Sequence, residues 1–320
     1  MKKIGVLTSG GDAPGMNAAV RAVTRAALAK GMEVVGIQRG YVGLLNHEFI
    51  EMNARTVSGI IQRGGTCLYT ARCPEFRNME GVLKGKEVCE EIGIEGLVVI
   101  GGDGSFRGAG DLSSVGIPCI GIPGTIDNDI QCTEYTIGYD TAMNTAMEMI
   151  DKLRDTTQSH ARCSVVEVMG RRAGFIAVNV AMAVGAEAAF TLEREYDLDK
   201  IAAKMIRTRD SKGKNHFIIV VSEGVGQAEN IARTIQEMTG IESRATILGH
   251  VQRGGSPTIR DRVMATEMGY HAVELLEQGI GNRIVGLKNG QIYDIDLQEG
   301  LAMKKPFIDT RYDILMETAY

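Results

Sequence analysis

The stretch Pro123-Gly124-Thr125-Ile126-Asp127-Asn128-Asp129 follows an apolar run, Ile117 to Ile122, that predicts a buried strand. Proline and glycine stop this strand, so the polar residues after them are expected in a loop at its end. In an open α/β sheet, ligands bind at that end of the strands. The loop carries one hydroxyl, one amide and two carboxylates, and no neighbouring residue in the sequence supplies a positive charge.

Two carboxylates this close are expected to raise each other's pKa, which would suit one of them to accept a proton near neutral pH. The alternative is a turn in which Asp and Asn only make local hydrogen bonds. This stretch alone leaves both interpretations open.

Two further apolar runs are followed by loops of the same kind. Ile4 to Leu7 precedes Thr8-Ser9-Gly10-Gly11-Asp12, and a helix is predicted from Met16 to Lys30. Leu97 to Ile100 precedes Gly101-Gly102-Asp103-Gly104-Ser105. Strand, glycine loop and helix together present free backbone N–H groups to a phosphate, although a tight turn without a ligand would also explain the first loop. That first loop is neither G-x-G-x-x-G nor a Walker A sequence.

The second half of the chain predicts more α/β units. Strands are expected at 164–168, 217–221 and 246–248, and the loops after them are Met169-Gly170-Arg171-Arg172-Ala173-Gly174, Ser222-Glu223-Gly224 and Gly249-His250-Val251-Gln252-Arg253-Gly254-Gly255. Each loop contains Arg, Glu or His, so the loops could converge on one crevice. His250 taken alone is more typical of a hydrogen-bonded core histidine. Asn289-Gly290 predicts a hairpin turn, and 309–319 predicts a capped terminal helix.

Composition narrows the class of protein. The chain has 320 residues, 44% hydrophobic and 23% charged, which is typical of a globular protein with room for two domains. A net charge of −5, no Trp and only 5% aromatic residues argue against a nucleic-acid surface. The most apolar later segment, Ala173 to Ala186, is too short to cross a bilayer, so no membrane contact is expected. The six cysteines form no C-x-x-C pair and are expected to be reduced thiols of a cytoplasmic protein.

Taken together, these loops closely resemble those of the bacterial ATP-dependent 6-phosphofructokinases, in the same order and spacing over nearly the whole chain. The resemblance implies an α/β protein with two Rossmann-like three-layer domains and mostly parallel sheets, assembled as a homotetramer. The larger, ATP-binding domain would be 1–138 plus 251–305, and the smaller, fructose 6-phosphate domain 139–250 plus 306–320. The implied reaction is phosphorylation of D-fructose 6-phosphate at its 1-hydroxyl to fructose 1,6-bisphosphate, a committed step of glycolysis.

The resemblance also implies roles for individual residues. ATP or its Mg²⁺ would contact Gly11, Arg72, Cys73, Arg77, Asp103, Gly104, Ser105 and Gly108, with Asp103 at the metal. Fructose 6-phosphate would contact Thr125, Asp127, Asp129, Met169, Gly170, Arg171, Glu223, His250 and Arg253, and also Arg162 and Arg244 of a neighbouring subunit. Asp127 would be the general base, aided in catalysis by Thr125, Arg171, Arg72 and Gly11.

An effector site is implied by Arg21, Arg25, Arg154, Gly185, Glu187, Lys212 and Lys214. ADP would activate there and phosphoenolpyruvate would inhibit. Without the resemblance, ordinary helix-surface charges would explain these residues. Gly59, Phe175 and Leu192 depart from the family pattern, which leaves the strength of regulation open.

The phosphoryl donor is expected to be ATP. Relatives that use pyrophosphate carry Asp where this chain has Gly104 and Lys where it has Gly124. Two other functions are compatible with part of this pattern. A kinase for another acceptor would share Gly-Gly-Asp-Gly but gives no reason for Arg162, Arg244 and His250 together. A nucleotide-sensing binding protein would not need Asp103 and Asp127.

Overall fold

The computed structural model describes residues 1–319. Its strands are β1 (Lys3–Thr8), β2 (Glu33–Ile37), β3 (Phe49–Met52), β4 (Gly96–Gly101), β5 (Cys119–Pro123), β6 (Cys163–Val168), β7 (Ala188–Phe190), β8 (Phe217–Ser222), β9 (Ser243–Ile247), β10 (Arg283–Lys288) and β11 (Gln291–Asp296). Its helices are α1 (Met16–Ala29), α2 (Tyr41–Leu45), η1 (Glu75–Arg77), α3 (Met79–Ile92), α4 (Asp103–Ser114), α5 (Tyr139–Ser159), α6 (Phe175–Ala183), α7 (Leu198–Lys212), α8 (Ala228–Thr239), η2 (Gly249–Arg253), α9 (Ile259–Glu277), α10 (Leu297–Ala302) and α11 (Asp309–Thr318).

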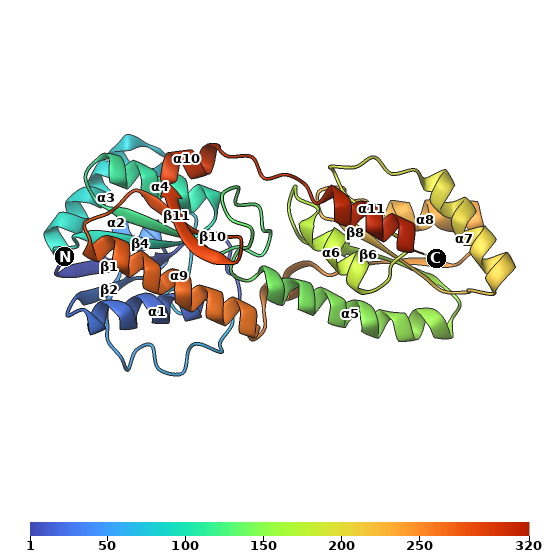
Figure 1. The fold of residues 1–320 in the computed structure, drawn as a ribbon, viewed down its shortest axis with the longest axis horizontal. Coiled ribbons are helices and arrows are strands. Elements are labelled where there is room, and N and C mark those ends of the chain that lie inside the picture. The colour runs from blue at the N-terminus through green and yellow to red at the C-terminus, as the bar shows by residue number, and fades with distance from the viewer. Residues whose placement is uncertain (320) are drawn as a thin grey trace. The chain divides into compact units, whose positions relative to one another are not determined.

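The chain forms two compact units and passes between them three times. The first unit contains 1–141 and 253–305, and the second contains 142–252 and 306–319. The chain leaves the first unit within α5, returns after η2, and leaves again after α10 (Figure 1). The two units are therefore not joined by a single linker.

The first unit is built on a seven-stranded sheet in the order β11-β10-β5-β4-β1-β2-β3. Its inner strands are parallel, and the edge strands β3 and β11 are antiparallel to their neighbours. Helices α1 and α9 pack together on one face, and α3 and α4 lie on the other (Figure 1). Because helices cover both faces, β4 and β5 are buried along their whole length, as their continuous apolar sequences predict.

The order of the strands reverses between β1 and β4. The connection from β1 leads to β2 on one side, whereas the connection from β4 leads to β5 on the other. The segments that follow β1, β4 and β5 start side by side there, because Ser9 N donates to Ile100 O at 2.9 Å and Gly124 N donates to Gly101 O at 2.9 Å. Ligands of open α/β sheets bind at such a reversal point.

The second unit has a four-stranded parallel sheet in the order β7-β8-β6-β9. Its core is formed by apolar side chains of the strands, α7 and α8, among them Phe190, Phe217 and Ile235. Helix α7 packs on α8, and α11 packs on α6. Together the two units confirm the predicted α/β class with mostly parallel sheets.

The start of α5 is fixed by a buried carboxylate. Asp261 on α9 accepts hydrogen bonds from Gly138 N and Thr141 N, each at 2.9 Å, and from the Thr141 hydroxyl at 2.5 Å. Burial raises the pKa of Asp261 to about 6, and the hydrogen bond from Thr141 opposes this shift. The first turns of α9 and α5 are thereby held together inside the first unit.

Most predicted elements are present, with differences at their ends. Asn289 and Gly290 have φ of 52° and 74°, which confirms the hairpin turn. Strand β9 begins three residues before its predicted start, because this edge strand contains Ser243 and Arg244 and lacks an apolar signal there. Helix α11 is present, but the predicted cap is wrong, since Ile308 stands at the N-cap and no side chain caps the helix.

All six cysteines lie within residues 1–319 and are free thiols. Burial raises the pKa of the Cys163 thiol to about 12, so this side chain behaves as an apolar core residue. In the same part of the chain, none of the helices has both the length and the apolar character needed to cross a bilayer.

Candidate active site

The polar loop after β5 lies beside the glycine loops of the first unit. Asp127 is fully buried, and the Thr125 hydroxyl donates to its Oδ2 at 3.3 Å and accepts from its backbone N at 3.2 Å. The Thr136 hydroxyl donates to Thr125 O at 2.6 Å and so fixes the start of the loop. Asn128 has φ of 53°, a left-handed conformation that Asn tolerates better than most residues. The loop is therefore a defined structure at the carboxyl ends of the strands.

Arg253 reaches the first glycine loop. Its Nη1 donates to Asp12 O at 3.3 Å, and a Cβ added to Gly11 would lie 2.6 Å from the same nitrogen. A side chain at position 11 would therefore displace the Arg253 guanidinium from this position. Arg253, predicted to bind the sugar, and Gly11, predicted to bind ATP, are in contact.

The segment that carries Arg72, Cys73 and Arg77 is held against the same loops. The Thr70 hydroxyl donates to Gly10 O at 2.7 Å, and both arginines are exposed. Burial is the main cause that raises the pKa of Cys73.

Tyr41 lies in no sequence motif, but it supports this arrangement. Its ring stacks on Phe76 with centroids 4.2 Å apart, and its hydroxyl donates to Ser105 O at 2.6 Å. A Cβ at Gly108 would lie 2.9 Å from the Tyr41 ring. The glycine at 108 is therefore explained by packing against Tyr41.

Asp103 is the first residue of α4, and its side chain is about half exposed. Arg107 Nε lies 3.0 Å from Asp103 Oδ2. Between residues 1 and 319, no three His, Cys, Asp or Glu side chains are grouped so as to hold a metal ion. Any Mg²⁺ at Asp103 would therefore take most of its ligands from phosphate oxygens and water.

A lysine distant in sequence supplies the positive charge that the neighbours of the Asp127 loop lack. Lys305 Nζ donates to Asn128 O at 2.8 Å, across 177 positions of sequence. Burial lowers the pKa of Lys305 to about 8, and the charge of Asp129 opposes this shift. No local pattern in the sequence points to this contact.

In the second unit, four of the predicted residues lie together at the ends of β6 and β8. Glu223 Oε2 accepts from Gly170 N at 3.2 Å and from Arg171 N at 2.9 Å, and Gln252 Oε1 accepts from Met169 N at 2.8 Å. The loop needs this support because Gly170 and Arg171 have φ of 142° and 52°. Gln252, to which no role was assigned, is fully buried.

His250 follows β9 in η2 and is exposed. The alternative that it is a hydrogen-bonded core histidine is therefore wrong.

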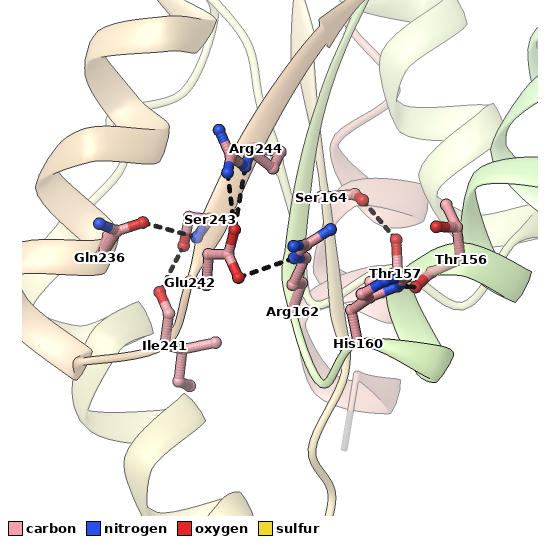
Figure 2. Close-up of polar contacts among 10 residues, drawn as sticks. All are labelled: Thr156, Thr157, His160, Arg162, Ser164, Gln236, Ile241, Glu242, Ser243 and Arg244. Atoms are coloured by element: carbon pink, nitrogen blue, oxygen red, sulfur yellow. Dashed lines mark hydrogen bonds and ion pairs between the residues drawn. The ribbon is translucent and has the colours of Figure 1, made fainter.

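Arg162 and Arg244 lie at the opposite end of this sheet and share one carboxylate, as Figure 2 shows. Glu242 Oε2 lies 2.8 Å from Arg162 Nε, and Glu242 Oε1 lies 2.8 Å from Arg244 Nη2. Hydrogen bonding to Arg162 and then to Arg244 holds the pKa of Glu242 below its usual value. Glu242 was missed because only folding brings it between the two arginines.

Strand β6 separates Arg162 from the Gly170 loop. Arg162 precedes the strand and Gly170 follows it, so roughly 20 Å of extended chain lies between them at about 3.3 Å per residue. One phosphate cannot touch both within the same chain.

A second charged cluster surrounds Glu187, which is 2% exposed. Lys214 Nζ pairs with its Oε1, and its buried Oε2 has no hydrogen-bond partner within residues 1–319. Burial lowers the pKa of His216, and the nearby Lys214 and Arg154 lower it further. Glu187 is therefore not an ordinary surface charge, and His216 joins the cluster.

The remaining effector candidates are more exposed or lie in the other unit. Gly185 has φ of 59°, and Lys212 is exposed at the end of α7. Arg21 and Arg25 lie on α1 of the first unit, where burial and then the charge of Arg25 lower the pKa of Arg21. Gly59, one of the departures from the family pattern, has φ of 68°, a left-handed conformation that favours glycine.

The sequence and the structure of this chain are both similar to those of known proteins. The family model described as phosphofructokinase matches residues 3–276. An ATP-dependent 6-phosphofructokinase from Clostridium botulinum is 56% identical over 314 residues, 98% of each chain, and one from Clostridium tetani is 54% identical over 100% of each. The phosphofructokinase of Saccharomyces cerevisiae has a TM-score of 0.90 at 35% identity, over 100% of this chain and 48% of the yeast chain. The chain belongs to the phosphofructokinase family.

Proposed function

We propose that this chain catalyses the ATP-dependent phosphorylation of D-fructose 6-phosphate at its 1-hydroxyl, a committed step of glycolysis in the cytoplasm. The observation that carries the proposal is the buried Asp127 on the loop after β5, next to the two glycine loops. The bacterial relatives that are more than half identical over the whole chain carry this activity in their names.

In the proposed reaction, Asp127 accepts the proton of the sugar 1-hydroxyl as that oxygen attacks the γ-phosphorus of ATP. A positioned base of this kind contributes about 10²–10⁴-fold to the rate. Arg72, Arg171 and the backbone N–H groups at Gly11 would stabilise the negative charge that spreads over the transferred phosphoryl group. Thr125 would orient the carboxylate, to which its hydroxyl already donates.

The residues around Asp103 could hold a Mg²⁺ ion that arrives bound to the nucleotide. One half-exposed carboxylate, Asp103, stands at a helix N-terminus beside the glycine loop, which suits a metal held mainly by phosphate oxygens. When bound, the ion would neutralise charge on the phosphates. Arg107 would then release or share the Asp103 carboxylate.

The residues proposed to contact the sugar are Asp129, Arg253, Met169, Gly170, Glu223 and His250. Arg162 and Arg244 would serve the sugar phosphate of a neighbouring subunit, because the length of β6 separates them from the Gly170 loop of their own chain. This requirement supports assembly into an oligomer, proposed to be a homotetramer.

One coupled assay tests the proposal. With Mg²⁺, ATP and fructose 6-phosphate, we expect fructose 1,6-bisphosphate to form, and we expect no reaction when pyrophosphate replaces ATP. Transfer to another acceptor instead would favour the other-kinase alternative. Binding of nucleotide without any transfer would favour a sensor.

Replacing Glu242 tests the pairing of the two arginines. A carboxylate that neutralises Arg162 and Arg244 competes with an incoming phosphate. We therefore expect Glu242→Gln to lower KM for fructose 6-phosphate by roughly threefold to tenfold, a modest effect because solvent screens exposed ion pairs. Steady-state kinetics measures this, with Glu237→Gln on α8 as the control. A raised KM would mean instead that Glu242 holds the arginines in place.

Replacing Glu187 tests the effector site. ADP is proposed to activate there, and its Mg²⁺ to bind the partnerless Oε2 of Glu187. We expect ADP to lower the half-saturating fructose 6-phosphate concentration of the unmodified enzyme and to lose this effect in Glu187→Gln. Allosteric couplings are typically about 5–150-fold. Glu195→Gln, at an exposed position, should respond to ADP normally, and a full ADP response in Glu187→Gln would contradict the assignment.

A further inference from the structure

Lys305 occupies an unusual place for a lysine. It follows α10 and is the last residue of the first unit before the chain passes to the second. Its side chain is largely withdrawn from water, and burial lowers its pKa to about 8. Lysine is rarely buried unless its charge has a partner, so the site of its ammonium group needs an explanation.

The explanation lies in the loop that contains Asp127. Lys305 Nζ donates to Asn128 O at 2.8 Å, and Lys305 N donates to Gln131 Oε1. Gln131 Nε2 in turn donates to Asp129 O at 3.0 Å. The lysine and the glutamine therefore close a ring of hydrogen bonds around residues 128–131.

The loop needs this support. Asn128 holds the left-handed φ of 53°, and a residue in this region persists only where its surroundings hold it there. Asn128 also stands between two aspartates in the sequence, and the charge of Asp129 interacts with Lys305. A cation at that carbonyl compensates both the exposed lone pair of the oxygen and the charge of Asp129.

A neutral side chain could not both donate to the Asn128 carbonyl and compensate the charge of Asp129. Methionine has similar length and would be less costly to bury, but it would leave the Asn128 carbonyl without a donor. The Asn128 side chain cannot replace Lys305, because its Nδ2 donates to Glu134 O at 3.2 Å.

We propose that Lys305 is a positioning residue of the phosphoryl transfer, which holds the Asp127 loop in the conformation that presents the base to the sugar hydroxyl. The inference rests on the proposed function of Asp127. A misplacement of about 1 Å in a reacting group can lower the rate about 10²-fold, so loss of the ammonium group would act on kcat.

The experiment compares Lys305→Met, Lys305→Arg and Lys304→Met in the full-length protein. Lys304 is the exposed neighbour and serves as the matched control. We expect Lys305→Met to lower kcat about 10–100-fold with KM for ATP unchanged. Lys305→Arg should recover most of kcat because it restores a donor and a charge, and Lys304→Met should resemble the unmodified protein.

Hydrogen exchange separates positioning from general damage to the fold. In Lys305→Met, we expect faster exchange for amides of 126–131 and unchanged exchange in β1 and β4. Faster exchange throughout the first unit, with no rescue by arginine, would overturn the proposal, as would an unchanged kcat in Lys305→Met. If the unmodified protein fails in the same assay, the proposed function itself is wrong, so the two failures are distinguishable.

Discussion

Asp127→Ser is expected to lower kcat by about 10²–10⁴-fold while KM for fructose 6-phosphate changes little. The substitution removes the proposed proton acceptor and leaves a small hydroxyl. Hydrogen bonds from Thr125, Thr136 and Lys305 would still hold the backbone of the loop. If Asp127 is the base, it acts in the transition state, and the other proposed contacts would still hold the sugar, so the loss should appear in kcat. Steady-state kinetics with both substrates varied measures it.

The control for this variant is Asp155→Ser, an exposed aspartate on α5 to which no role is assigned. It should keep full activity. Thermal unfolding of both variants should show a folded protein. If Asp127→Ser kept kcat within a few-fold of the unmodified enzyme, another group would have to be the base.

Gly104→Asp is expected to abolish most use of ATP without destabilising the fold. A Cβ at Gly104 meets no atom within 4 Å, so the protein itself leaves room for a side chain there. The residue is the second of α4, where a negative charge stabilises the helix and where glycine is a poor helix former. The structure therefore offers no packing reason for glycine, whereas the proposed passage of the ATP phosphates beside this residue would be one.

The size of the effect follows from charge. A carboxylate about 4 Å from a phosphate costs about 4 kcal/mol at the dielectric constant of a protein surface, which corresponds to roughly a 10³-fold loss in kcat/KM for ATP. Ser114→Asp, at the exposed end of the same helix, is the control and should retain activity. A Gly104→Asp enzyme that used ATP normally would remove the argument that this glycine makes space for the nucleotide.

The sequence predicted those elements that are determined by residues close together in the chain. The strands β1, β4, β5, β6 and β8 were recognisable because each is a continuous apolar run that ends in glycine, proline or a polar residue. The loops that follow them carry most of the candidate residues, and parallel strands bring such loops to one edge. The hairpin turn at Asn289 and Gly290 was equally local.

What the sequence could not predict are contacts between distant segments. The Asp127 loop seemed to lack a positive charge because its cation, Lys305, is supplied from the far end of the first unit. Glu242 has no motif of its own, and its role follows only from the pairing of β6 with β9, which brings it to Arg162. The predicted start of β9 was wrong for a related reason. Polar residues occupy the first positions of this edge strand, so its sequence shows no apolar run there.

The three passages of the chain between its units have a consequence for how such a protein can be divided. A fragment that ends at Thr141 would lack α9, α10 and the hairpin strands, which return to the first unit only after 252. A fragment that starts at Ala142 would carry those elements without the sheet they complete. A single cut in the chain therefore never yields a fragment that contains all of one unit and none of the other.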